Sequence, residues 1–149
     1  MNLKEKINED LKTAMKSGEK LRLETIRSIR ALILEFEKSG TGKELTPEEE
    51  VRMLSTAVKK RKDSAEQYRG GGRIDLAEKE EAEMNILLEY LPKQLNEEEV
   101  TAKIKDLAVQ LGASTKADFP KLMPAAMKEL KGMADGKMVK SIVEKVLEG

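Results

Sequence analysis

A proline at position 92 interrupts the chain between two stretches of helical hydrophobic spacing. In the segment EYLPKQLNEEEV, the residue before Pro92 disfavours α-helical geometry, so a helix is expected to end at Tyr90-Leu91. Asn96 is followed three residues later by Glu99, a pair that can cap the start of a new helix. The sequence therefore predicts a boundary here between two groups of helices.

Helical spacing runs through the chain on both sides of this boundary. Apolar residues recur every three or four positions, as in Ile26, Ile29 and Ile33, and no segment shows the period of two that is typical of a strand. We therefore expect an all-α protein with two domains. Residues 1–92 are predicted to form four helices, including a long antiparallel hairpin, and residues 93–149 a compact domain of three short helices. A single continuous bundle of seven helices is the alternative.

Three consecutive glycines, Gly70-Gly71-Gly72, separate two long helical patterns and predict the turn of the hairpin. With the turn centred between the first two of them, Arg61 lies opposite Glu80 and interrupts an otherwise apolar stripe. We predict an ion pair between Arg61 and Glu80, with Glu83 as a second acceptor, because the planar guanidinium can bridge two carboxylates. Removing one partner should cost more stability than removing both, since a lone charge would then be buried.

Local signals also predict where other helices begin and end. Thr46 can cap a helix whose first position holds a proline, and Glu49 can reach back to the N–H group of Thr46. Asp135 is predicted to cap the last helix, and the second helix is expected to end near Gly40.

The chain contains neither histidine nor cysteine. This inventory excludes a Ser–His–Asp triad, a histidine-based zinc site and a redox thiol. The 28 basic and 28 acidic residues balance, so bulk charge gives no attraction to nucleic acid. The charged N-terminus is unlike a secretory signal, and no apolar run approaches the ~20 residues that span a bilayer. We therefore expect a cytoplasmic protein with no membrane partner, no metal and no cofactor.

Two segments resemble the YqeY family, and the resemblance extends over essentially the whole chain. They are KKRKDSAEQYRGGGRIDLAEKEEAEMNILLEYLPKQL and LKGMADGKMVKSIVEKVL. The second is also similar to the tail domain of GatB, a subunit of the glutamine-dependent amidotransferase that converts mischarged Glu-tRNA or Asp-tRNA. Gly132, Ala134, Asp135 and Lys137 match the pattern of that tail, whereas Met133 stands where a basic residue is usual.

In the amidotransferase, the tail domain contacts tRNA and the reactions take place on other domains and subunits. The resemblance therefore implies a tRNA- or amidotransferase-associated binding module. It also implies carbon–nitrogen ligase activity with glutamine as amido-N-donor. The residues do not supply that chemistry, because the chain lacks a cysteine nucleophile, a Ser-Ser-Lys arrangement and a phosphate-binding Gly-x-x-x-x-Gly-Lys-Ser/Thr loop. We expect no catalytic residue, with ligase activity as the third alternative.

Four lysines close to a predicted turn at Gly132–Gly136 are the candidate nucleic-acid-binding residues: Lys128, Lys131, Lys137 and Lys140. Lysines and exposed helix N–H groups could converge there on phosphates. The partner would be tRNA or a tRNA-processing protein. Two alternatives stay open: the lysines serve only solubility, or the long N-terminal helices make the protein a protein–protein interaction adaptor.

Three other patterns each have a structural and a functional interpretation. The triple glycine, flanked by Arg69 and Arg73, is either a hairpin turn or a phosphate site. The run from Lys59 to Lys62 is either a nucleic-acid patch or a solvated face. Runs of glutamate either supply metal ligands or have structural roles: two complement a helix dipole at helix starts, and the middle one pairs with Arg61. The glutamate runs lie within residues 48–50, 80–83 and 97–99.

Overall fold

The computed structural model describes residues 1–39 and 45–148, and most of these are α-helical. That part of the chain contains seven α-helices and one short 3₁₀ helix, and it contains no strand. The prediction of an all-α protein is therefore confirmed. The helices form two compact units, Met1–Leu91 and Pro92–Gly149, and each has a hydrophobic core of its own.

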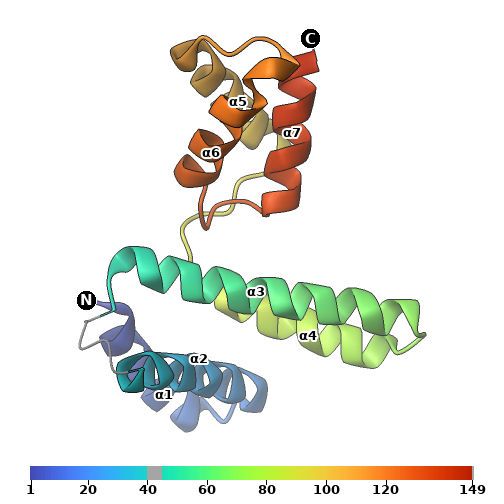
Figure 1. The fold of residues 1–149 in the computed structure, drawn as a ribbon. Coiled ribbons are helices and arrows are strands. Elements are labelled where there is room, and N and C mark those ends of the chain that lie inside the picture. Colours follow the sequence, from blue (N-terminus) through green and yellow to red (C-terminus); the bar gives the residue numbers. More distant parts are fainter. Residues whose placement is uncertain (40–44, 149) are drawn as a thin grey trace. The chain divides into compact units, whose positions relative to one another are not determined.

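The described residues of the N-terminal unit form two helical hairpins (Figure 1). The hairpins are α1 (Leu3–Ser17) with α2 (Lys20–Lys38), and α3 (Pro47–Gly70) with α4 (Ile74–Leu88). Between α1 and α2, Gly18 adopts a left-handed conformation with φ of 74°, which ends α1 and reverses the chain at once. The predicted helix end near Gly40 lies outside the described residues.

One core joins the two hairpins of this unit. α2 packs against both α1 and α4, and apolar side chains from all four helices meet there. The largest fully buried side chains are Ile7, Ile26, Ile29, Ile33, Leu54 and Leu87. On α2, the three isoleucines recur at spacings of three and four, so they form one apolar stripe facing the core.

The end of α4 differs from the prediction. The sequence predicts an end at Tyr90-Leu91, whereas the regular α-helix ends at Leu88. The N–H groups of the next three residues each donate to the carbonyl three residues earlier, which tightens the last turn. The chain therefore leaves α-helical geometry before it reaches the residue that precedes the proline.

Tyr90 joins this end of α4 to the first hairpin. Its hydroxyl donates a hydrogen bond to Asp10, and the Lys6 ammonium group lies 5.1 Å from the centre of its ring. Burial, together with the bond to the Asp10 carboxylate, raises the pKa of Tyr90 above its usual value. Arg22 of α2 donates two hydrogen bonds to Glu89, at 2.8 and 3.3 Å, and this pairing raises the pKa of Arg22. These contacts hold the first hairpin against the end of the second.

The C-terminal unit contains three α-helices and a short 3₁₀ helix. They are α5 (Glu97–Leu111), η1 (Lys116–Asp118), α6 (Phe119–Glu129) and α7 (Gly136–Glu148). As the sequence predicts, Asn96 caps α5: its side chain accepts from the N–H of Glu99 at 2.8 Å, and the Glu99 carboxylate accepts from the N–H of Asn96 at 3.3 Å. The helix ends at Gly112, which has a φ of 68°.

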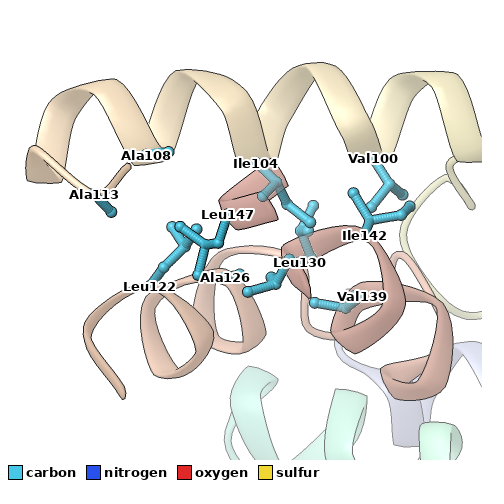
Figure 2. Packing of buried hydrophobic residues seen from close by; sticks show 11 residues of the cluster. Val100, Ile104, Ala108, Ala113, Leu122, Ala126, Leu130, Val139, Ile142 and Leu147 are labelled. Atoms are coloured by element: carbon cyan, nitrogen blue, oxygen red, sulfur yellow. The ribbon is translucent and has the colours of Figure 1, made fainter. Parts of the chain in front are cut away.

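The three helices of this unit enclose a small core (Figure 2). Val100 and Ile104 of α5 point toward Ile142 of α7, and Leu122 of α6 lies beside Leu147 of α7 (Figure 2). All five side chains are at most 3% exposed, so the unit excludes water from its own interior.

Asp118 shapes the connection between α5 and α6. Its carboxylate accepts hydrogen bonds from the N–H groups of Ser114 and Thr115, at 2.9 and 3.1 Å. These two backbone bonds lower the pKa of Asp118 because they favour its ionised form. Pro120 lies in the first turn of α6, where the N–H group that proline lacks has no partner within the helix.

Candidate functional site

The four predicted lysines lie along the connection between α6 and α7. Lys128 is in the last turn of α6, Lys131 follows that helix, and Lys137 and Lys140 are in the first turns of α7. All four are exposed, and within the described residues none of them forms an ion pair. Residues three apart on a helix share a face, so Lys137 and Lys140 lie on one side of α7. Their ammonium groups are available to a ligand.

The turn between α6 and α7 is held in shape by the segment that precedes α5. Gly132 has a φ of 77°, a conformation that favours glycine. The N–H of Leu95 donates to the carbonyl of Met133 at 2.9 Å, and the Gln94 amide donates to the carbonyls of Pro92 and Gly132, at 2.9 and 2.6 Å. The lysines therefore extend from a turn whose backbone is fixed by hydrogen bonds.

The N-terminus of α7 is already capped. The N–H of Lys137 donates to the carboxylate of Asp135 at 2.9 Å, so Asp135 caps the helix as the sequence predicts. A phosphate therefore does not have this N–H available, contrary to the expectation that exposed N–H groups join the lysines. The lysine side chains remain as the groups that can bind an anion at this turn.

Arg61 connects three helices of the N-terminal unit. Its Nε lies 3.2 Å from Oε2 of Glu83 on α4, and the two side chains are 19% and 17% exposed. Its guanidinium also donates to the carbonyl of Ala57 at 3.3 Å and to the hydroxyl of Ser28 on α2 at 3.2 Å. These three contacts tie α2, α3 and α4 together around the guanidinium group.

The ion-pair partner of Arg61 differs from the one predicted first. Within the described residues Arg61 forms no ion pair with Glu80, the acceptor predicted first, and pairs instead with Glu83, the predicted second acceptor. α3 and α4 leave a turn centred on Gly72, about one and a half residues later than predicted. Positions equidistant from Gly72 place Arg61 opposite Glu83, which explains the change.

The triple glycine forms a hairpin turn. The N–H groups of Gly71, Gly72 and Arg73 all donate to carbonyl oxygens near the end of α3. Arg69 is paired with Glu81, and Arg73 lies 3.5 Å from an aspartate in the first turn of α4. Because these three backbone donors are used and the flanking arginines are paired, the structure favours the hairpin turn over a phosphate site.

The positions of the remaining charged runs on their helices explain them without a ligand. Glutamates 48–50 and 97–99 lie in the first turns of α3 and α5, where negative charge is favourable. Within residues 1–39 and 45–148, no group of three or more acidic side chains converges to hold a metal ion. In the run from Lys59 to Lys62, Arg61 is turned inward, so the run is not a continuous basic patch. No helix in the described chain is long and apolar enough to cross a membrane.

One concave surface was not predicted from the sequence. A groove of about 550 Å³ lies between α2 and α3 in the N-terminal unit, and its apolar lining includes Leu32, Phe36, Met53 and Ala57. A sequence signal for it exists, because Leu32 and Phe36 form a second apolar row beside the core stripe of α2.

Comparison with known proteins finds relatives along nearly the whole chain. The family described as Yqey-like protein (YqeY) matches residues 4–147. A protein of Lachancea thermotolerans named "Altered inheritance of mitochondria protein 41, mitochondrial" is 34% identical over 110 residues, which are 72% of this chain and 59% of that relative. A protein of the same name from Pyrenophora tritici-repentis is 30% identical over 146 residues, covering 95% of this chain and 79% of the relative. A Saccharomyces cerevisiae protein of that name is 31% identical over 130 residues, covering 86% and 68%.

These relatives overturn the prediction of a cytoplasmic protein, because each of the three is named as a mitochondrial protein. The prediction rested on the missing cysteines, the charged N-terminus and the absence of long apolar runs. Those features do not distinguish one cellular compartment from another.

Proposed function

Because the chain belongs to the YqeY family, we propose that it is a non-catalytic binding module whose C-terminal unit contacts the phosphate backbone of tRNA. The observation that carries this proposal is the group of four exposed lysines, unpaired within the described residues, on both sides of the α6–α7 turn. Its partner in the cell is tRNA or a protein that processes tRNA.

Local rather than overall charge favours RNA binding at this turn. The chain as a whole has no net charge, so it has no long-range attraction to nucleic acid. At the α6–α7 turn, however, lysines lie on two helices that a hydrogen-bonded turn holds together. Lysine–phosphate contacts hold a protein on RNA, but they do not distinguish one base sequence from another. We therefore expect binding that depends strongly on salt and weakly on base sequence.

A self-contained enzyme is a weaker proposal. Carbon–nitrogen ligase activity with glutamine as amido-N-donor needs a group that attacks the glutamine amide, and this chain has no cysteine for that step. Glutaminase activity of the purified chain, lost on replacement of one carboxylate or lysine, would establish the enzyme instead.

Titration of the full chain with tRNA at several salt concentrations tests the proposal. If the four lysines each neutralise one phosphate, the plot of log affinity against log salt should have a slope of about −3 to −4. Changing Lys128, Lys131, Lys137 and Lys140 together to glutamine should abolish saturable binding at 0.1 M salt or bring the slope close to zero.

A matched control uses four lysines of the first hairpin that are also exposed: Lys12, Lys16, Lys20 and Lys38. Replacing these by glutamine changes the net charge equally and should leave the affinity within about twofold, because contacts rather than net charge carry the binding. The absence of saturable binding by the unchanged protein at low salt would remove the proposal.

The second candidate function is a protein–protein interaction adaptor. The groove between α2 and α3 favours it, since an apolar concave surface on long helices is a typical place for another helix to bind. Recovery of one protein at fixed stoichiometry, unchanged by nuclease treatment, would support the adaptor.

A further inference from the structure

The groove between α2 and α3 results from the way the hairpins pack. α2 packs on α1 and α4, and α3 packs on α4, which leaves the facing sides of α2 and α3 apart from each other. The hydrogen bond from Arg61 to Ser28 closes one end of the groove. Phe36 and Glu49 line the opposite end, because α2 and α3 run in opposite directions along it.

Glu49 does not complete the capping box that the sequence predicts at the start of α3. The N–H of Glu49 donates to the Thr46 hydroxyl at 3.2 Å, as a capping box requires, but the carboxylate does not return the bond. Oε2 of Glu49 is instead buried, with no hydrogen-bond partner among the described residues. In the same protein, Asn96 and Glu99 form both halves of the box. An unpaired buried carboxylate oxygen is unfavourable. Because Glu49 also lines the groove, a small rotation of its side chain would bring this oxygen to a donor that enters the groove.

The dimensions of the groove fit a helix. The α2 side extends from Ser28 to Ser39, which at 1.5 Å per residue is about 16 Å, or three turns of helix. The α3 residues that line the groove, from Glu49 to Arg61, recur at helical spacing over a similar length. A long apolar floor between two parallel walls binds an amphipathic helix, as in other helix-in-groove complexes.

The charges around the groove specify the chemistry of that helix. Arg52 and Lys60 lie on the α3 side, and both are exposed and form no ion pair within the described residues. Glu49 lies at the same end of the groove as Phe36, and Glu35 lies on the α2 side. A complementary helix carries acidic residues along the flank that faces α3 and a basic residue at the end that reaches Glu49.

We propose that this groove binds an amphipathic helix of a partner protein, with apolar side chains on Leu32, Phe36 and Met53 and a lysine or arginine hydrogen-bonded to Glu49. The site lies in the N-terminal unit, so it is independent of the lysines of the C-terminal unit. It goes beyond RNA binding and gives the chain a second, protein-binding surface.

A photo-crosslinking amino acid at Thr56, which lines the groove, tests the proposal in the full chain in cells. The control position is Glu66, which is exposed on α3 outside the groove. We expect a nuclease-resistant crosslink from Thr56 alone, also in the variant that lacks the four C-terminal lysines. Sequencing of the crosslinked peptide should place the crosslink in a segment of the partner protein that has apolar residues at helical spacing and a basic residue at one end. No specific crosslink, a crosslink to RNA, or a segment without this pattern would overturn the proposal.

A synthetic peptide of the crosslinked segment then tests the role of Glu49. Glu49→Gln should weaken peptide binding about tenfold or more, because it removes a charge-assisted hydrogen bond. The free protein should be about equally stable, because Oε2 of Glu49 forms no hydrogen bond within the described residues. Glu48→Gln makes the same charge change in the same turn at an exposed position and should leave the affinity unchanged. Equal affinity of the Glu49→Gln variant and the unchanged protein would contradict the proposal.

Discussion

Replacing Leu122 by alanine is expected to unfold the C-terminal unit and leave the N-terminal unit folded. Leu122 is 0% exposed in the core that α5, α6 and α7 enclose. Truncating a fully buried leucine costs about 2–5 kcal/mol, and a single core of this size supplies only about 3–5 kcal/mol. Hydrogen exchange followed by mass spectrometry should show lost protection in residues 92–148 and unchanged protection in residues 1–39 and 45–91.

The control for this prediction is Val109→Ala. Val109 is on α5 of the same unit, but its side chain is 82% exposed, so the change should alter stability by less than about 0.5 kcal/mol. If Leu122→Ala lowers protection equally in both units, the chain unfolds as one cooperative body. The two units would then not be independently stable domains.

Replacing Arg61 by methionine is expected to destabilise the N-terminal unit by about 2–3 kcal/mol. Losing one member of a fully buried ion pair costs about 3–5 kcal/mol, and an exposed pair contributes at most about 1 kcal/mol. The Arg61–Glu83 pair lies between these limits because its side chains are 19% and 17% exposed. The substitution leaves the Glu83 carboxylate and the Ser28 hydroxyl without their donor. Urea unfolding measures the effect.

A second variant separates the ion pair from simple packing. Changing Arg61 to methionine and Glu83 to leucine together should cost less than the single Arg61 change, since no unpaired charge remains. Arg69→Met provides the control, because the Arg69–Glu81 pair is 44% and 36% exposed and should contribute less than about 1 kcal/mol. A double variant less stable than the single one would show that the charge on Glu83 is not what makes the single change costly.

Helix boundaries were predictable from the sequence where neighbouring residues decide them. Asn96 and Asp135 each cap the helix that follows, because a side chain and the N–H group it binds are separated by only two or three residues. Gly18 ends α1 for a similar local reason. Helical spacing also predicted which isoleucines of α2 are buried.

Features that depend on contacts between helices were predicted less well. The partner of Arg61 depends on the register of α3 against α4, and a small shift of the turn to Gly72 exchanged Glu80 for Glu83. Glu49 has the sequence of a complete capping box, yet its carboxylate lies in a groove that exists only because α2 and α3 pack on other helices. No local pattern contains this information.

Mapping tRNA binding onto the full chain by NMR shows which unit of the protein contacts RNA. Titration of the ¹⁵N-labelled protein with tRNA should shift the backbone amide signals of residues 128–140, together with those of Gln94 and Leu95, which are hydrogen-bonded to that turn. The signals of α1 to α4 should stay in place. Shifts confined to the N-terminal helices, or no shifts at a salt concentration well below 0.1 M, would contradict the proposal that the lysines around the α6–α7 turn contact RNA.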